Sequence, residues 1–240
     1  MAEVYPGDHY CWSTDPDGSR SKPDRIAIVI HTSGREAGRG RMDDVDATLY
    51  VGPNSQFDFR DPERRNRGGG RMEYDHDSGL LHSRMHDGFC GFMQTAMMRA
   101  AGVEPRRADL DERIAHTTMA RFVIHFGEVF DKVVQAAYLR GRQYADSVGH
   151  LGVMCKIGRH RSNACAYWIY HFLLKHEFQV QLRCHAPRKT HLDNRGPCGC
   201  LFGRCTYESD RQWTARMLEA RECAQAAFDR IADACFRRSS

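Results

Sequence analysis

Apolar residues gather in short runs along the chain, and these runs predict the strands of a sheet. Residues 25–32 form a continuous, β-branched run that is typical of a strand buried in a parallel sheet. Residues 151–154 form a second apolar run, and residues 178–182 alternate between apolar and polar positions. Two segments, residues 46–51 and 56–60, compete for one further strand.

Longer stretches carry apolar residues at the spacing of an amphipathic helix. Residues 80–101 are predicted as one helix, which Gly102 ends and whose Met and Phe stripe belongs to a core. Residues 110–144 are predicted as a second helix. A third begins near Arg161, and a fourth covers residues 210–236.

Helices placed between strands predict an α/β fold with a mostly parallel sheet flanked by helices. A phosphate-binding loop between a central strand and a helix is expected, together with an extra C-terminal helix. The predicted organisation has four parts. They are a flexible arm (1–24), an α/β phosphate-binding domain (25–190), a cysteine-rich loop (191–209) and the C-terminal helix (210–240).

The composition is that of a globular chain large enough to bury a full core. The chain has 240 residues, of which 41% are hydrophobic and 28% charged. It has no apolar run of membrane-spanning length and no signal-peptide pattern, which indicates a cytoplasmic protein with no membrane partner. A formal charge of +4 mildly favours phosphate-bearing partners. Ten cysteines in such a chain indicate reduced thiols, a metal site or catalysis, and not a disulfide framework.

The clearest chemistry lies in the loop that follows the run 151–154, which reads Cys-Lys-Ile-Gly-Arg-His-Arg-Ser and ends at Ser162. Gly158 permits a tight turn, and the N–H groups of such a loop and of the helix after it can surround an anion. Arg159 and Arg161 offer guanidinium groups that match the geometry of a phosphate. We therefore expect an anion-binding loop.

The same loop has the C-x5-R-[ST] spacing of cysteine-dependent phosphatases. Their thiolate attacks phosphorus, which requires a thiol of lowered pKa at a helix N-terminus beside cations, and Cys155 is placed for that. Two features weaken this interpretation. Met154 stands where those enzymes usually have a histidine, and no W-P-D-like loop supplies a general acid, although Asp58 or Asp61 could serve geometrically. A phosphatase with Cys155 as nucleophile is the alternative to a binding loop.

The loop and three other segments resemble the C-terminal domain of the RapZ family. The family's loop has the form C-x-x-G-[KR]-H-R-S, in which His160 is the residue that ordinary phosphatases do not require. The other segments resemble, in family order, a D-x-R strand end, a T-G-L helix start and an Arg/His-rich strand end. These are Phe57-Asp58-Phe59-Arg60-Asp61-Pro62, Asp77-Ser78-Gly79-Leu80 and Gln181-Leu182-Arg183-Cys184-His185. The match spans roughly residues 25–190, and it favours residues 56–60 as the second strand.

In the RapZ family this domain senses glucosamine-6-phosphate and binds RNA. The resemblance therefore implies a regulatory binding module whose partner is a phosphorylated small molecule, such as an amino sugar phosphate, or RNA. The bacterial members also carry a nucleotide-binding domain with a G-x4-G-K-[ST] loop, and no such motif occurs here, so nucleotide hydrolysis is not expected. The implied phosphate contacts are Cys155, Gly158, Arg159, His160, Arg161, Ser162, Arg60 and His185.

A second cluster of candidate ligands lies between the last predicted strand and the last helix. It consists of His191, Cys198, Cys200 and Cys205. Thiolate and imidazole groups suit tetrahedral zinc, and a metal would stiffen a loop with little apolar content. However, the pair at 198 and 200 is tighter than the C-x2-C of zinc fingers, and free thiols are the alternative. A structural zinc is the one cofactor that the sequence suggests.

The terminal helix keeps a third interpretation open, that of an interaction protein. The apolar stripe of residues 210–236 lies outside the RapZ-like match. The helix either packs on the domain or forms a homo-oligomer. Dimerisation that is sensitive to chelators would favour this third interpretation.

Overall fold

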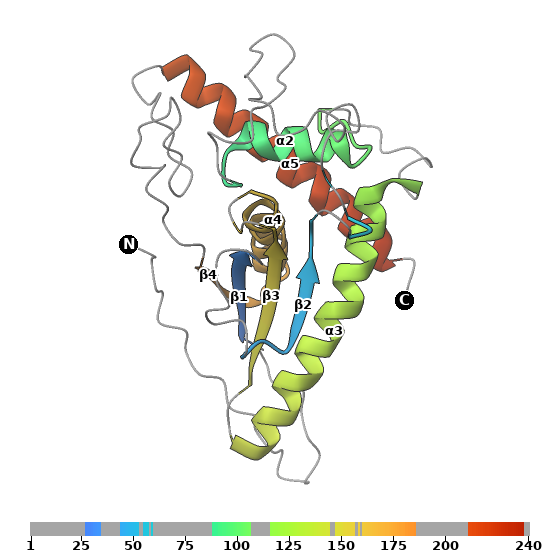
Figure 1. Ribbon diagram of the computed structural model, residues 1–240, viewed down its shortest axis with the longest axis vertical. Coiled ribbons are helices and arrows are strands. Elements are labelled where there is room, and N and C mark those ends of the chain that lie inside the picture. The colour runs from blue at the N-terminus through green and yellow to red at the C-terminus, as the bar shows by residue number, and fades with distance from the viewer. Residues whose placement is uncertain are drawn as a thin grey trace.

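The elements of the fold are taken from a computed structural model, which describes residues 27–34, 44–52, 55–57, 59, 88–106, 116–144, 147–156, 158, 160–185 and 211–237 (Figure 1). The predicted arm and the cysteine-rich loop lie outside these residues. In chain order the elements are β1 (Ala27–Gly34), β2 (Ala47–Tyr50), α2 (Gly91–Ala100), α3 (Thr118–Tyr144), β3 (Val148–Cys155), α4 (Arg161–Lys175), β4 (Gln179–Cys184) and α5 (Arg211–Arg237).

The four strands form one parallel sheet in the order β2-β3-β1-β4. The two central strands, β1 and β3, pair along their whole length, from Ala27 opposite Val148 to Gly34 opposite Cys155. The chain passes from β2 to β3 through α2 and α3, and from β3 to β4 through α4. This architecture confirms the predicted α/β fold with a parallel sheet and flanking helices.

The second strand is not the one that was favoured. Residues 47–50 pair with β3, so the preference for residues 56–60 is wrong. Phe57 and Phe59 alternate with polar residues and both are buried, but they lie outside any strand and pack edge-to-face on Phe122 of α3. Their alternation therefore reflects packing on a helix.

Successive side chains of a strand point to opposite faces, and the two faces of this sheet differ in chemistry. One face is apolar and carries the core residues Ile28, Ile30, Leu49, Leu151 and Val153. The other face carries His31, Ser33, His150, Gln181 and Arg183, as the strand register requires. We call these the apolar face and the polar face.

Helices α3 and α4 cover the apolar face. Val133 of α3 and Ile28 of β1 both lie against Gly149 of β3, which marks this face as the one that α3 covers. Trp168 and Ile169 of α4 are fully buried in the same core. Because both crossovers advance across the sheet in the same direction, the single preferred hand of such connections places both helices on one side.

Helix α5 packs on α2, α3 and α4 and forms the outer layer of the domain (Figure 1). Its Phe228 stacks on Trp168 of α4, and its Phe236 packs against Phe126 of α3. Its apolar stripe is thus buried within the chain, which answers the question that the sequence left open about this helix. None of the helices among the described residues is long and apolar enough to cross a bilayer.

Two of the predicted helices begin later than the sequence suggested. Residues 88–90 form a turn, and α2 starts at Gly91 after an extended Cys90. Helix α3 starts at Thr118, although its pattern was predicted from residue 110. The backbone of Gly91 lies against Met217 of α5, and a side chain there would overlap that helix. The start of α2 therefore coincides with a close helix crossing.

Helix α4 ends in a Schellman motif. The N–H of Phe178 donates to the carbonyl of Leu173, and the N–H of Glu177 donates to that of Leu174. Glu177 holds the left-handed conformation that this motif requires, with φ of 62°. Glycine is the usual residue there, because a β-carbon in this conformation costs roughly 1–2 kcal/mol.

We expect Glu177→Gly to raise the free energy of unfolding by about 1 kcal/mol, since it removes this strain. Urea denaturation monitored by circular dichroism measures the change. Glu177→Ala is the matched control, because it removes the carboxylate and keeps the β-carbon. An equal gain in both variants would show that the charge, and not the backbone, limits stability here.

Candidate functional site

The loop that carries the C-x5-R-S pattern joins the carboxyl end of β3 to the start of α4, at the centre of the sheet. Gly158 lies in this loop with φ of 83°, a conformation that favours glycine. Its backbone packs so closely on β1 that a β-carbon would overlap the backbone nitrogen of Gly34. Because Gly34 is also the register partner of Cys155, the loop rests on the end of the neighbouring strand.

The loop surrounds the sulfur of Cys155 with hydrogen-bond donors. The N–H of Gly158 donates to Sγ at 3.1 Å, and the hydroxyl of Ser162 lies 3.3 Å from it. The side chain is only 2% exposed. Burial raises the pKa of this thiol, but hydrogen bonds from the side chain and the backbone of Ser162, the charge of Arg161 and the Gly158 N–H outweigh burial and hold the pKa below its usual value.

The start of α4 adds to this preference for negative charge. His160 is the N-cap residue and its side chain makes no capping hydrogen bond. The first turn contains no acidic residue, and Arg161 stands at its first position. A helix N-terminus carries partial positive charge, so the thiol of Cys155 lies where the dipole, the loop N–H groups and the guanidinium all favour an anion.

A contact that the sequence did not reveal holds a second segment against this helix start. The backbone of Gly88 lies so close to α4 that a β-carbon would overlap the carbonyl of His160 and the nitrogen of Ala164. The backbone carbonyl of Gly88 accepts a hydrogen bond from the side-chain amide of Gln94 of α2. The side-chain carbonyl of Gln94 in turn accepts a hydrogen bond from the indole N–H of Trp168. The turn before α2 is thus fixed on the first turn of α4. No motif marks these residues, since the link runs through buried polar atoms of three elements.

His185 lies at the end of β4, next to the end of β1. Its backbone N–H continues the ladder of β4 by donating to the carbonyl of Thr32, and its imidazole is on the polar face. There its Nε2 lies 2.8 Å from Nδ1 of His31. The thiol of Cys155 belongs to the core on the apolar face. His185 and Cys155 therefore flank the end of β1 from opposite faces of the sheet.

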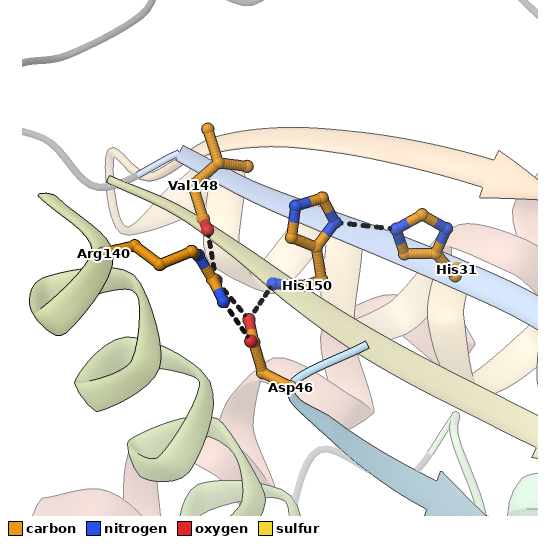
Figure 2. A network of polar contacts seen from close by, with 5 residues as sticks. All are labelled: His31, Asp46, Arg140, Val148 and His150. Atoms are coloured by element: carbon orange, nitrogen blue, oxygen red, sulfur yellow. Dashed lines mark hydrogen bonds and ion pairs between the residues drawn. The ribbon is translucent and has the colours of Figure 1, made fainter. Parts of the chain in front are cut away.

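His31 forms the centre of a chain of three imidazoles. Besides its contact with His185, its Nε2 lies 3.0 Å from Nδ1 of His150, and Figure 2 shows this second contact. Its side chain is 8% exposed. Burial is the largest cause that lowers the pKa of His31, and the positive charges of His150, His185 and Arg183 lower it further. Together they bring the pKa to about 4, although the carboxylate of Asp46 acts in the opposite direction.

A carboxylate at the start of β2 organises the other end of this network (Figure 2). Asp46 accepts the guanidinium of Arg140 through both carboxylate oxygens and accepts the backbone N–H of His150 at 2.6 Å. The same guanidinium donates to the carbonyl of Val148 at 2.6 Å. Burial raises the pKa of Asp46, but the hydrogen bonds from Arg140 and His150 outweigh it and lower the pKa. Asp46 therefore joins α3, β2 and β3 as an ionised carboxylate.

Several candidate residues lie outside the described part of the chain. Two of them, Arg60 and Arg159, are predicted phosphate contacts. Two more, Asp58 and Asp61, were considered as general acids. The others are the four candidate zinc ligands, His191, Cys198, Cys200 and Cys205. Within the residues that the structure describes, no group of three histidine, cysteine or acidic side chains has the arrangement of a metal site. The structure thus brings together Cys155, Gly158, Arg161 and Ser162, with His160 at the N-cap position of α4.

We expect the thiol of Cys155 to be ionised at a lower pH than an ordinary cysteine, and Ser162→Ala to raise its pKa because the largest stabilising hydrogen bond is lost. The difference in ultraviolet thiolate absorbance between the wild type and Cys155→Ser, followed against pH, isolates this one thiol. An unchanged titration in Ser162→Ala would show that the hydroxyl does not stabilise the thiolate.

We expect the fold to lose stability between about pH 6.5 and about pH 4 because of His31. The unfolded chain protonates this imidazole near its ordinary pKa of 6.5, while the folded chain does so near 4, so the unfolded state binds more protons in this window. The full shift corresponds to about 3 kcal/mol. Urea denaturation at a series of pH values measures it. His31→Gln removes the titration, and an equally steep pH dependence in that variant would assign the loss to other groups.

No protein-family model matches the chain, and no curated protein matches it.

Proposed function

We propose that this domain binds a phosphate-bearing ligand at the loop between β3 and α4. The observation that carries the proposal is the set of hydrogen bonds around the buried Sγ of Cys155, which also holds the pKa of this thiol below its usual value. A buried group whose ionised form is favoured marks a point at which the protein has already arranged donors around one negative charge. The donors are the N–H of Gly158, the hydroxyl and N–H of Ser162, and the charge of Arg161.

The position of the loop supports the same proposal. In parallel α/β sheets, ligands bind beyond the carboxyl ends of the strands, and this loop follows the carboxyl end of a central strand. Phosphate is the anion that suits it best, because the guanidinium of Arg161 and the N–H groups of a helix N-terminus both match phosphate oxygens. The overall excess of positive charge acts in the same direction.

The resemblance to the RapZ family suggests the class of ligand. A regulatory module of this kind would bind an amino sugar phosphate or the phosphates of RNA. The residues Cys155, Gly158, His160, Arg161 and Ser162 match the family's loop position by position. Glucosamine-6-phosphate and a short structured RNA are therefore the first ligands to compare.

A cysteine-dependent phosphatase is the second candidate, and the same lowered pKa favours it. In that reaction Sγ of Cys155 would attack phosphorus, the bond to the leaving oxygen would break, and water would later release phosphate from the phosphocysteine. The 2% exposure of Cys155 argues for binding over turnover, because an attacking sulfur must reach the phosphorus atom. The first experiment separates the two functions.

We expect Arg161→Ala to weaken binding of glucosamine-6-phosphate by roughly 10- to 100-fold, the loss of a charge-assisted hydrogen bond. Isothermal titration calorimetry measures the affinity. Arg216→Ala removes the same charge from an exposed position on α5 and should change the affinity less than about twofold. Equal affinities in the wild type and Arg161→Ala, for the sugar phosphate and for RNA, would refute the assignment of the loop.

Hydrolysis of an aryl phosphate tests the second candidate. We expect no turnover by the wild type, and ligand-dependent thermal stabilisation that is retained in Cys155→Ser. Turnover that disappears in Cys155→Ser would instead identify a phosphatase with this nucleophile.

A further inference from the structure

The polar face of the sheet contains buried side chains, although no helix among the described residues packs on it. The helices that pack closely on the strands, α3 and α4, both lie on the apolar face. On the polar face, Val29 of β1 is only 7% exposed, and His31 is buried as well. Neighbours in a sheet stand beside such side chains and not above them, and parallel sheets are usually covered on both faces. These exposures are those of a single chain, so the cover belongs to the chain itself.

Val29 shows that the cover includes apolar groups. The register places Val29 between His150 and Gln181, on the polar face. Val29 is not part of the hydrophobic core, whereas Ile28 and Ile30 on either side of it are. An apolar side chain that is buried outside the core has apolar contacts of its own. The covering segment must therefore supply apolar or aromatic side chains.

The charge of the polar face selects the sign of the covering segment. The four strands contain no acidic residue, and Arg183 of β4 is the one side chain among them with a permanent charge. Arg183 is exposed, and its guanidinium donates to the neutral side chain of Gln181. The imidazoles of His31, His150 and His185 are either neutral or positively charged. Carboxylates are therefore the charged groups that suit this face.

Residues 1–19 have the composition that such a cover requires, and we call them the acidic segment. They contain four acidic residues and no lysine or arginine, although the whole chain has a formal charge of +4. They also contain one valine, two tyrosines and one tryptophan. The acidic residues are Glu3, Asp8, Asp15 and Asp17, and the apolar and aromatic ones are Val4, Tyr5, Tyr10 and Trp12.

The acidic segment is connected closely enough to reach the whole face. Residues 20–26 separate it from Ala27, where β1 begins. A spacer of this length spans up to about 23 Å when extended, and a strand as long as β1 measures about 26 Å. The acidic segment can therefore lie over any part of the polar face, from Val29 to Arg183.

Two other segments outside the described residues carry the wrong charge for this face. Residues 35–43 follow β1 and residues 186–210 follow His185, so both start beside the polar face. Each of them contains more basic than acidic residues. Beside Arg183 they would add repulsion where the acidic segment adds attraction.

Two further segments contain acidic residues but belong to the side of the helices. Residues 60–87 are bracketed by Phe59, which packs on α3, and by Gly88, which lies against α4. Residues 107–115 join α2 to α3. Both connections begin and end among the helices, so the acidic segment is the one whose charge and place in the chain both fit.

We propose that the acidic segment, residues 1–19, docks on the polar face of the sheet of its own chain. Its carboxylates lie toward Arg183 and the histidines, and its apolar and aromatic side chains cover Val29. The segment thereby forms the second layer over the sheet, opposite α3 and α4. Because the attraction is between charges at the surface, the contact weakens as salt is added.

Zero-length cross-linking of the full chain tests this contact. A water-soluble carbodiimide joins a carboxylate to an amine as an amide, with loss of water, where the two groups touch. Arg183→Lys keeps the positive charge and places an amine on the polar face. We expect mass spectrometry to find this amine joined to carboxylates of residues 1–19, with a yield that falls by about threefold or more in 1 M salt.

A matched variant controls for chance encounters of the segment with lysines. Arg121→Lys places the same amine on the exposed side of α3, on the opposite side of the sheet. We expect it to give no cross-link to residues 1–19.

Histidine acylation measures the cover without any change on the sheet. Glu3→Gln, Asp8→Asn, Asp15→Asn and Asp17→Asn together remove the charge of the acidic segment and keep its length. Diethyl pyrocarbonate acylates accessible imidazole nitrogens, so weaker docking exposes the polar face to it. We expect the rate at His185 to rise by about threefold or more in this variant, since several surface ion pairs are lost. The exposed His116, outside the sheet, should react at the wild-type rate.

The outcomes decide which segment covers the face. Cross-links from the amine of Arg183→Lys to residues 73–77, or to no carboxylate of this chain, overturn the proposal. Equal cross-linking by Arg121→Lys, or an unchanged acylation rate at His185 in the neutral variant, does the same. Cross-links to residues 1–19 of a second copy, recognised in mixtures of isotopically light and heavy chains, would replace docking within the chain by exchange between chains and also overturn it. None of these results bears on the loop of Cys155.

Discussion

The pairing of β1 with β3 is the constraint on which the rest of the domain depends. Its register sets Gly34 opposite Cys155, which gives the loop after β3 a backbone surface to rest on. The same register sets His31 within reach of His150. A slip of one residue would turn every side chain of a strand to the other face, and would place the histidines in the core and the apolar residues on the polar face. The site and the hydrophobic core therefore stabilise one and the same alignment.

One face of this sheet packs against helices, and the other carries polar and titratable side chains. The apolar face binds α3 and α4 into a core that α5 completes, so that the loop of Cys155 is held on a well-packed base. The polar face carries a chain of three imidazoles in contact, with His31 buried at its centre. Asp46 and Arg140 link the faces, because this ion pair ties α3 to the start of β2 and β3. The ionised form of Cys155 is favoured at the edge of the sheet, whereas the protonated form of His31 is disfavoured beside it.

The errors of the sequence analysis have identifiable causes. Residues 56–60 alternate as a strand does, yet Phe57 and Phe59 take their burial from Phe122 of α3, so the period of two had another origin. The start of α2 at Gly91 coincides with a close approach of α5, which a helical pattern does not reveal. The family resemblance assigned His185 to the phosphate site. Its contact with His31 on the polar face has no signal in the sequence around it.

The sequence by itself determined what local periodicity and short motifs can encode. The strand before Cys155, the helix that begins at Arg161 and the glycine between them follow from the order of residues alone, because a loop of this kind is built from neighbours in the chain. Only the tertiary structure decided which strand lies beside which, and with it the chain of His31, His150 and His185. His150 and His185 are 119 and 154 positions from His31 in the sequence, and nothing in the local sequence of any one of the three indicates the others. Strand order and register, which are set by the packing of the whole core, bring them together.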